Sequence, residues 1–273
     1  MKISILTPTY NRAKNLSKLY ESLKENLKYE IEIEWLIMDD GSKDNTREVV
    51  NHFIENEKMI IRYFFQENQG KMNALNNLVP EATGDFIIEC DSDDYFTENA
   101  FKHIKEQCIL DEQIYAYAFL KYNQDKCNIG KLFKEDGMEN TMFDLYFKQK
   151  EDGEKALVFN AHIRKKYCHK LEGNEKFITE ARLYHKMDKD YKIKCYNQPI
   201  MICQYQKDGY TNNIKEVFKK NPKGYYEYFK EIFEHNMQGI TFQKRLYVIK
   251  HFILFSYLTK ARKINEIYKR NFK

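Results

Sequence analysis

Three carboxylates fall within four residues, at Asp91, Asp93 and Asp94, directly after the apolar run 84–90. An apolar run of strand length that stops at clustered acids predicts a buried strand that delivers carboxylates to its C-terminal end, where open α/β sheets bind ligands. Because the three charges repel one another, a cation among them is expected. Oxygen ligands suit magnesium, manganese or calcium, and such an ion could neutralise a phosphate-bearing ligand. The alternative is an acidic turn that caps the following helix.

Polar loops also follow the earlier strand patterns at 3–6, 33–38 and 59–65, which alternate with helical patterns. This order predicts a parallel sheet with right-handed crossovers, and therefore an α/β fold. The carboxyl ends of parallel strands share one edge of the sheet. We therefore expect these loops to lie along that edge: Pro8 to Asn11, Asp39-Asp40, Gly70-Lys71 and Asp91 to Asp94. The sequence has neither the glycine pattern of a dinucleotide fold nor that of a P-loop.

Beyond residue 100 the pattern is less regular. We expect a helix to about residue 111, strands at 114–120 and 153–160, a strand pair at 191–196 and 200–205, and helices from about residue 222.

The composition is that of a folded protein of one large domain or one domain with an elaboration, since 42% of its 273 residues are hydrophobic. The six cysteines form no Cys-x-x-Cys pair, which predicts reduced thiols and a cytoplasmic protein. The longest apolar run, 246–258, is interrupted by Lys250 and His251, and a spanning helix needs about 18 apolar residues. We therefore expect a protein that is soluble or bound to a membrane only at its surface.

Positive charge is concentrated at the C-terminal end of the chain. Residues 241–273 carry nine Lys or Arg against Glu266 alone, so this part has a net charge of +8 and residues 1–240 one of −4. A basic end predicts contact with an anionic surface, here the inner face of a membrane. The alternative is a helix pair that closes the fold with a solvated basic face. No nucleic-acid recognition module is visible, so we expect no nucleic-acid partner.

Five motifs occur in the order and spacing of glycosyltransferase family 2: Ser4 to Asn11, Asp39 to Ser42 with Asp44, Asn68-x-Gly70 leading to Ala74 and Asn76, Gly84 to Ile87, and Asp91 to Asp94. The chain resembles this family most strongly over residues 1–100. The resemblance implies the GT-A fold, in which a Rossmann-like, mostly parallel central sheet is flanked by helices. It implies a GT-A domain over 1–215, with a nucleotide-binding half to residue 100 and an acceptor-binding half from 101, and a helical, basic C-terminal extension over 216–273.

The resemblance also implies an activity. The family, here of the bacterial polysaccharide type, transfers a sugar with inversion from a nucleotide donor to an acceptor. We expect a UDP-sugar donor, Mn²⁺ or Mg²⁺, a glycan or lipid-linked saccharide as acceptor, and a role in cell-surface polysaccharide synthesis. The alternatives are a sugar-phosphate nucleotidyltransferase and a nucleotide- or glycan-binding protein without turnover.

Site residues follow by matching the family motifs. Those expected at the nucleotide are Pro8, Thr9, Tyr10, Asp40, Lys71, Asn76, Asp91 and Ser92. Asp40 is expected to accept a hydrogen bond from a nucleobase N–H, and Tyr10 to stack on the base. Lys71 would pair with the diphosphate or with Asp40. Asp93 and Asp91 are expected to contact the metal, with Asp94 as the alternative ligand. The aspartates could instead be ordinary turn acids, and Tyr10 a packed loop aromatic. Lys71 could be a solvated lysine and Asn76 a surface amide.

The catalytic base is expected at the start of the helical pattern that contains Leu183 and Met187. The family usually has Glu-Asp there, whereas this chain has Thr179-Glu180, which leaves both Glu180 and Glu175 open as the base. The offset to Leu183 favours Glu180. A base of this kind removes the proton of the acceptor hydroxyl.

Overall fold

The computed structural model describes residues 1–271 except 56–58, 150, 207–208, 211 and 235–236, and it describes no side chain from residue 262 onward. The strands are β1 (Lys2–Thr9), β2 (Glu32–Asp39), β3 (Ile60–Phe65), β4 (Phe86–Glu89), β5 (Tyr95–Phe96), β6 (Ile114–Tyr122), β7 (Met138–Asn140), β8 (Lys155–Asn160) and β9 (Lys192–Ile202). The helices are α1 (Ala13–Asn26), α2 (Thr46–Glu55), α3 (Lys71–Glu81), α4 (Ala100–Gln107), α5 (Ala161–Arg164), α6 (Ala181–Met187), α7 (Ile214–Lys220), α8 (Pro222–Glu234) and α9 (Phe242–Asn271). A 3-10 turn, η1 (Leu27–Tyr29), and a π-helical turn, η2 (Asp144–Lys148), complete the elements.

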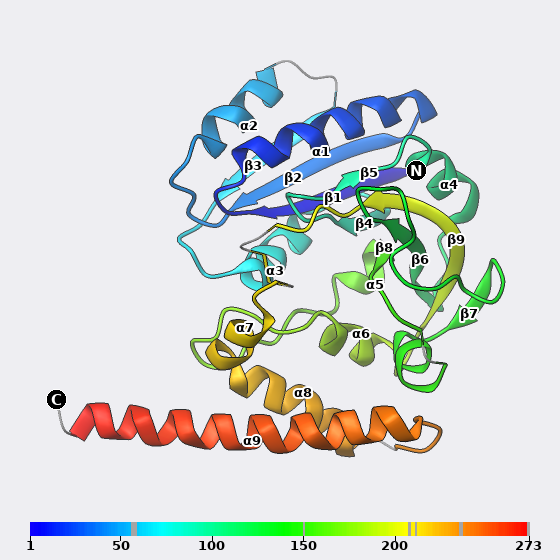
Figure 1. Ribbon diagram of the computed structural model, residues 1–273. Coiled ribbons are helices and arrows are strands. Elements are labelled where there is room, and N and C mark those ends of the chain that lie inside the picture. The colour runs from blue at the N-terminus through cyan, green and yellow to red at the C-terminus, as the bar shows by residue number, and fades with distance from the viewer. Residues whose placement is uncertain (56–58, 150, 207–208, 211, 235–236, 272–273) are drawn as a thin grey trace.

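The strands form a sheet in the order β3-β2-β1-β4-β8-β6-β9-β5, and β7 pairs with the outside of β9 (Figure 1). Strands β3, β2, β1 and β4 run parallel, and β6 and β9 are also parallel. In this register Thr9 lies beside Asp39, and Asp39 beside Phe65. The loops that follow these strands therefore leave the sheet at the same edge. The predicted α/β fold with a mostly parallel central sheet is confirmed, and β5, β7 and β8 supply the antiparallel pairs.

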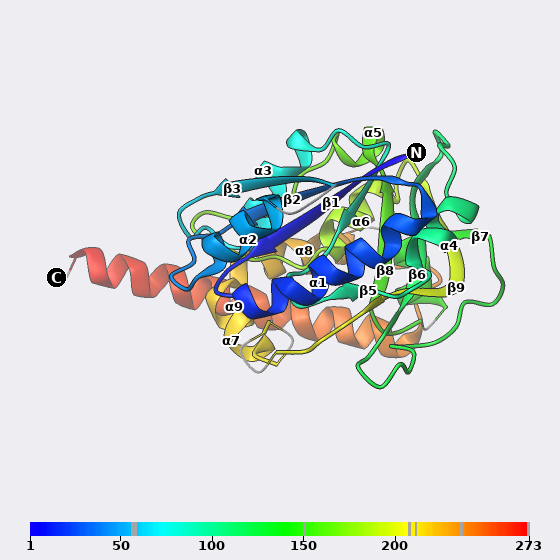
Figure 2. The same ribbon diagram turned by 90° about the horizontal axis from the view of Figure 1, so that it is seen from above.

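Helices cover both faces of this sheet (Figures 1 and 2). On one face α1, α2 and α4 bury side chains such as Leu19, Phe53 and Phe101 against Trp35. On the other face α3, α5 and α6 form a second core that includes Leu75. The apolar positions of α1 recur every three or four residues, which is why one side of that helix is buried.

A third hydrophobic cluster holds the C-terminal helices against the domain. Helices α7, α8 and α9 bury aromatic and aliphatic side chains, including Tyr225, Phe229 and Phe255, against Phe147 of η2 and Ile178, which precedes α6. The expected helical C-terminal part is confirmed, although helix formation begins at Ile214 rather than near residue 222. The division at residue 215 stays a prediction.

The expected strand pair at 191–196 and 200–205 is wrong. The segment forms one strand, β9, which continues through Pro199 and pairs with β6 along its length. Register shifts near Leu120 absorb residues 197–199, which lie between the two expected strands. The irregularity bends β9 so that its last residues also pair with β5.

Candidate active site

A cavity of about 980 Å³ lies at the edge of the sheet where β1, β2 and β4 end. Loops after these strands, the start of α3 and the start of α6 form one end of it, and α8 and α9 line the other. Pro8, Thr9 and Tyr10 face the first end together with Ser92. The predicted convergence of these loops is therefore present. A volume of this size can enclose a ligand as large as a nucleotide sugar.

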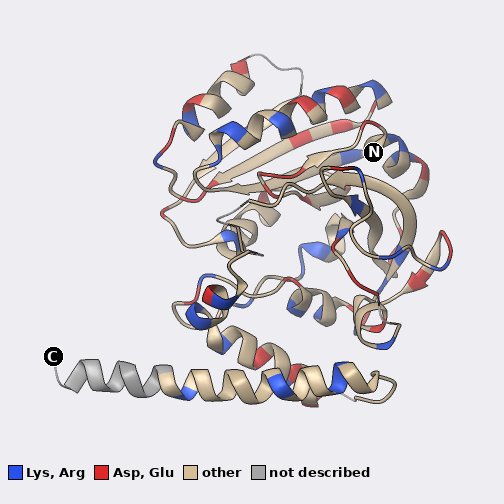
Figure 3. Cartoon of the chain, viewed as in Figure 1, with Lys and Arg blue, Asp and Glu red and all other residues tan. Residues whose placement is uncertain are grey.

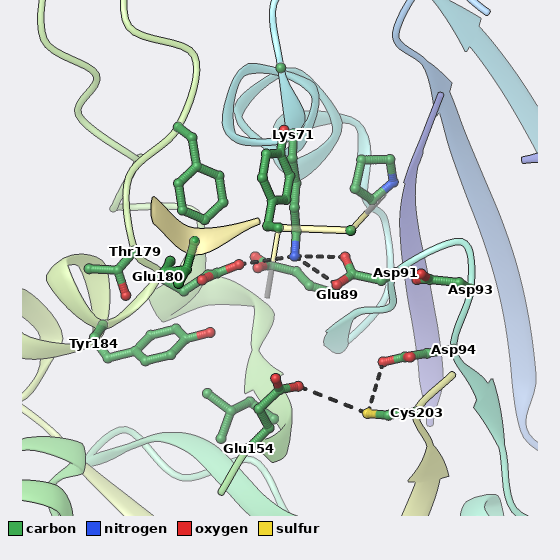
Figure 4. A pocket seen from close by; sticks show the side chains of 18 of the residues that line it. Lys71, Glu89, Asp91, Asp93, Asp94, Glu154, Thr179, Glu180, Tyr184 and Cys203 are labelled. Carbon is green, nitrogen blue, oxygen red and sulfur yellow. Dashed lines mark hydrogen bonds and ion pairs between the residues drawn. The ribbon is translucent and has the colours of Figure 1, made fainter. Parts of the chain in front are cut away.

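Lys71 lies at the centre of the charged part of the cavity (Figure 4). Its Nζ is 2.7 Å from Asp91 Oδ1 and 2.9 Å from Glu180 Oε1. Burial lowers the pKa of Lys71, but the two carboxylates outweigh it and raise that pKa well above its usual value. Burial raises the pKa of Asp91 and of Glu180, and the ammonium of Lys71 outweighs it and lowers both. All three groups are therefore ionised at neutral pH.

The backbone around Gly70 sets the position of Lys71. Gly70 has φ +92°, and a Cβ atom there would lie 2.4 Å from the carbonyl oxygen of Lys176. Only glycine allows this close approach between the start of α3 and the segment that precedes α6. Lys176 also donates from Nζ to Asn68 Oδ1 at 2.8 Å. These contacts bring Lys71 and Glu180 together although 109 positions separate them in the sequence.

Asp93 and Asp94 have different surroundings. Asp94 is buried, and its Oδ2 is 3.1 Å from Lys121 Nζ and accepts from the Cys203 thiol at 3.4 Å. Asp93 lines the cavity, and no other described residue forms a hydrogen bond or ion pair with its carboxylate. Burial, followed by the charges of Asp91 and Asp94, raises the pKa of Asp93 to about 6. Asp93 is thus the carboxylate of the cluster that has no ion pair with a described residue, and the charge of Arg12 lowers its pKa by less than burial and the two neighbouring carboxylates raise it.

Among the described residues, no group of three or more His, Cys, Asp and Glu side chains is placed to hold a metal ion. The donor chemistry nonetheless fits a hard divalent cation, because Asp93 is a carboxylate whose ionised form is disfavoured by its neighbours. Asp91 offers a second carboxylate, which now contacts Lys71. Asp94 is a poorer candidate since Lys121 already neutralises it.

The buried carboxylate of Asp40 organises the loop that leads into α3. Its Oδ1 accepts from Gln66 Nε2 and from the backbone N–H of Gln69, both at 2.7 Å, and its Oδ2 accepts from the N–H of Gly70 at 2.8 Å. A carboxylate has about four lone-pair sites, so one is left for a base N–H. Asp40 also lines the cavity, which keeps its predicted role open.

Tyr10 and Thr9 line the same end of the cavity. The side chain of Tyr10 is 44% exposed, so one face of its ring is free to stack on a planar ligand. The Thr9 hydroxyl is buried without a hydrogen-bond partner among the described residues. An unpaired buried hydroxyl beside a cavity is a candidate ligand contact.

Two expected site residues lie outside the cavity. The amide of Asn76 exchanges two hydrogen bonds with the backbone of His169, at 2.9 Å and 2.8 Å, and so ties α3 to the segment after α5. The buried carboxylate of Glu175 accepts from the N–H groups of Lys223 at 2.9 Å and Gly224 at 2.7 Å. These N–H groups at the start of α8 have no partner within the helix. In the structure Asn76 therefore acts as a tether and Glu175 as a helix cap, and their roles at the nucleotide and as the base stay predictions.

Further polar residues of the cavity were not expected from the sequence. Lys121, at the end of β6, is 3.6 Å from Glu154, and Tyr184 points into the space between Glu154 and Glu180 (Figure 4). Tyr184 follows Glu180 by four residues, and this helical spacing could have indicated it. Lys121 and Glu154 carry no motif that distinguishes them.

Glu89, the last residue of β4, also faces the cavity. Its Oε1 accepts from Nε and from a terminal nitrogen of Arg164, each at 2.7 Å, and Arg164 is fully buried. This pair places a neutralised carboxylate beside the Lys71 cluster (Figure 4). No local sequence pattern indicates this pair, because Arg164 lies 75 positions from Glu89.

The other end of the cavity is aromatic. His185 packs against Phe143, Phe147 and Tyr228 with ring centroids 5.1 Å, 5.7 Å and 5.6 Å away. Burial lowers the pKa of His185 to about 3, so the ring is neutral at pH 7. Phe147 and Tyr228 line the cavity with His185. This end offers flat apolar faces and few charges.

Sequence comparison relates the greater part of the chain to known proteins. A family model described as glycosyl transferase family 2 matches residues 4–171. A GalNAc(5)-diNAcBac-PP-undecaprenol beta-1,3-glucosyltransferase of Campylobacter jejuni is 28% identical over 209 residues, covering 70% of this chain and 65% of that protein. An uncharacterized glycosyltransferase of Mycoplasma pneumoniae is 35% identical over 123 residues, covering 43% of this chain and 41% of the relative. The aligned region thus spans less than two thirds of either relative.

Solved structures share the fold. The crystal structure of S. aureus TarS 1-349 superposes with a TM-score of 0.61 at 17% identity, covering 100% of this chain and 76% of that one. The same protein in complex with UDP-GlcNAc gives 0.60 at 18% identity with the same coverage. A mannosyltransferase from Pyrobaculum calidifontis in complex with GDP-Man and Mn²⁺ gives 0.58 at 14% identity, covering 96% and 75%. At these identities the likeness establishes the fold alone.

Proposed function

Because the chain belongs to glycosyl transferase family 2 and has the GT-A fold, we propose that it transfers a sugar from a nucleotide-sugar donor to a saccharide acceptor. The observation that carries this proposal is the position of the Lys71 ammonium between Asp91 and Glu180, at the edge where the parallel strands end. A donor site needs cationic and acidic groups around a diphosphate, and a transferase also needs a carboxylate base beside them.

The donor would occupy the end of the cavity formed by the strand-end loops. Tyr10 is positioned to stack on the base, and the remaining acceptor site of Asp40 suits a base N–H. A UDP-sugar is our preferred donor, since a structural neighbour was solved with UDP-GlcNAc. Lys71 would exchange part of its contact with Asp91 and Glu180 for the donor's diphosphate. Asp93 and Asp91 are the residues that would hold a divalent cation.

The chemical step would use Glu180. Its lowered pKa keeps it ionised at neutral pH, so it can take the proton of an acceptor hydroxyl. The acceptor oxygen then forms a bond to the anomeric carbon while the bond from that carbon to the diphosphate oxygen breaks, and the nucleoside diphosphate leaves with the electron pair. Attack from the face opposite the leaving group inverts the anomeric configuration. When bound, a divalent cation would help to neutralise the charge that develops on the diphosphate.

The acceptor would enter from the aromatic end of the cavity. Phe147 and Tyr228 offer faces on which a sugar ring can stack, and Tyr184 and Glu154 line the same cavity near Glu180 (Figure 4). The Campylobacter relative is named for an undecaprenol-linked saccharide. We therefore propose a lipid-linked saccharide or glycan acceptor, and a role on the cytoplasmic side of cell-surface polysaccharide synthesis.

A screen of donors tests the proposal. The protein is incubated with Mn²⁺ and a panel of UDP- and GDP-sugars, and release of nucleoside diphosphate is measured with water or simple saccharides as acceptors. We expect one UDP-sugar to be consumed with release of UDP. Release of pyrophosphate from a sugar phosphate and UTP would indicate a nucleotidyltransferase instead. Tight binding of UDP with no turnover of any donor or acceptor would indicate a binding protein.

A further inference from the structure

Helix α9 has apolar side chains on two opposite faces. Val248 and Phe255 are fully buried on the inner face, where α9 packs against α8. A second row of large apolar side chains is exposed to solvent: Phe242, Leu246, Ile249, Ile253 and Tyr257. We call this row the outer stripe. Its members are separated by three or four residues, so they lie on one side of the helix over about 22 Å.

The exposure of the outer stripe is large for such residues. The side chains of Phe242, Ile253 and Tyr257 are 74%, 62% and 69% exposed. Single exposed apolar residues need no explanation, but a continuous row on one helix face marks a surface that another body covers. No other described residue of the chain covers the outer stripe.

The charge around the outer stripe identifies the kind of body. Arg245, Lys250 and Lys260 are exposed on the same helix, and residues 241–265 contain no acidic residue. Figure 3 shows Lys and Arg, and no Asp or Glu, along the part of α9 that is drawn in colour. An amphipathic helix of this kind lies in the interface of an anionic bilayer, with its apolar side in the acyl boundary and its cations at the headgroups.

The position of α9 relates this surface to the cavity. Lys244 and Tyr247 of α9 line the acceptor end, so the helix that carries the outer stripe also forms a wall of the site. In Figure 1 the helix runs along the bottom of the molecule, on the far side from α1 and α2. A bilayer on the outer stripe would therefore lie next to the end of the cavity at which the acceptor is expected.

We propose that the outer stripe and the cations beside it bind the surface of an anionic lipid bilayer. The choice of a lipid-linked acceptor rests on the proposed function, whereas the binding itself does not. No helix of the described residues is long and apolar enough to cross a membrane, so the contact is at the surface. A second copy of the chain is a poorer partner, because pairing two outer stripes would bring cations against cations.

Vesicle binding by the full chain tests the proposal. Co-sedimentation is measured with vesicles of phosphatidylcholine alone and with an equal mixture of phosphatidylcholine and phosphatidylglycerol, at low and high salt. We expect binding to the anionic vesicles that weakens at high salt, and little binding to the neutral ones. Equal binding to both kinds of vesicle, or none to either, would overturn the proposal.

Two pairs of variants assign the binding to α9. Ile253→Asn with Tyr257→Asn should weaken binding about tenfold or more, because two apolar side chains no longer enter the bilayer. The matched control is Ile109→Asn with Leu110→Asn, which changes side chains of similar exposure far from α9. Lys250→Gln with Lys260→Gln should also weaken binding about tenfold or more, whereas Lys102→Gln with Lys189→Gln should not. Thermal unfolding confirms that each variant is folded.

The outcomes separate this proposal from the proposed function. If donor turnover occurs and anionic vesicles do not bind, the bilayer surface is wrong and the transferase stands. If vesicles bind through the outer stripe and no donor is turned over, the bilayer surface stands and the proposed transferase activity is wrong. Sedimentation that shows a dimer abolished by the Ile253 and Tyr257 substitutions, together with no vesicle binding, would assign the outer stripe to a second copy.

Discussion

The two ends of the cavity are built in different ways. The donor end consists of loops that directly follow β1, β2 and β4, and charged groups dominate it: Lys71, Asp91 and Asp93. The acceptor end consists of side chains from η2, α6, α8 and α9, and aromatic rings dominate it. One end is fixed by the register of a parallel sheet, and the other by packing between helices.

This difference separates two tasks. In the proposed function the donor end would bind a charged group that nucleotide sugars share, and a rigid sheet edge with fixed charges suits that task. The acceptor end would select one saccharide, and segments that can vary without altering the sheet suit that task. Glu180 lies at the junction, since it starts α6 and contacts Lys71 of the donor end.

The largest expected effect belongs to Glu180. Glu180→Gln should lower kcat by about 10² to 10⁴, because it removes a base and keeps the shape. It also removes the ion pair with Lys71, so the unfolding temperature should fall as well. Glu175→Gln is the matched variant, and it should lower stability by about 1 kcal/mol through the start of α8 with much less effect on kcat. Initial rates and thermal unfolding of both proteins are the measurements. Full turnover in Glu180→Gln would exclude it as the base.

Lys71 should show the next largest effect. Lys71→Met leaves the carboxylates of Asp91 and Glu180 without their shared cation, and the donor without a partner. We expect kcat/KM to fall about 10-fold to 100-fold, as is typical for loss of a charged hydrogen bond. Lys71→Arg should retain part of the activity, and Lys189→Met, at an exposed lysine, should retain all of it. If Lys71→Met has normal donor affinity and kcat, the bridge has no functional role.

The pH dependence of stability should distinguish the two ends. The pKa of His185 is lowered to about 3 in the fold, below its ordinary value of about 6.5. As the pH falls through 6.5 the unfolded chain binds a proton that the folded chain does not, so stability is full above pH 6.5 and decreases below it. At pH 5 the loss from this group is about 2 kcal/mol. The lowered pKa values of Asp91 and Glu180 act in a lower window, since their contribution is lost only below about pH 4.

Urea unfolding at pH 7 and pH 5 measures this effect. His185→Phe should reduce the pH-dependent loss by about 2 kcal/mol relative to the unsubstituted chain. His162→Gln, at an exposed histidine, is the control. The pKa of His169 is also lowered by burial. Because His169 is present in all these proteins, its contribution to the loss of stability cancels in the comparison. An unchanged loss in His185→Phe would show that the acceptor end is hydrated enough for His185 to be protonated.

The smallest expected effect belongs to Tyr10. Tyr10→Ala should weaken UDP binding by about 1 kcal/mol, or about fivefold, since the ring is partly exposed and supplies one stacking face. Tyr10→Phe should bind normally because it keeps that face. Titration calorimetry measures both. Equal weakening in the two variants would assign the contact to the hydroxyl group.

The donor end could be predicted from the sequence because its residues follow strands directly. Asp91, Asp40 and Tyr10 reach the cavity through strand ends, and the order of strands and helices sets that geometry. Glu175 and Asn76 lie outside the cavity lining because each makes its contacts with backbone groups remote in sequence, at Lys223 and His169. No local sequence pattern predicts contacts of this kind.

The acceptor end could be predicted only in part. The sequence indicated helices after residue 222 and a helix start near Glu180, but not that α8 and α9 line the cavity. Lys121 and Glu154 meet because β6 and β8 are neighbours in the sheet, and that pairing depends on the whole topology. The strand pair expected at 191–196 and 200–205 was wrong because a shift in register, which has no sequence motif, keeps β9 continuous.

The central claim is that the strand-end loops bind a nucleoside diphosphate together with a divalent cation. Calorimetric titration of UDP, with and without Mn²⁺, tests it in the unsubstituted chain and in Asp93→Asn. The account predicts that Mn²⁺ tightens UDP binding at least about tenfold and that Asp93→Asn abolishes this gain. UDP binding that is the same with and without Mn²⁺, and unaffected by Asp93→Asn, would contradict it.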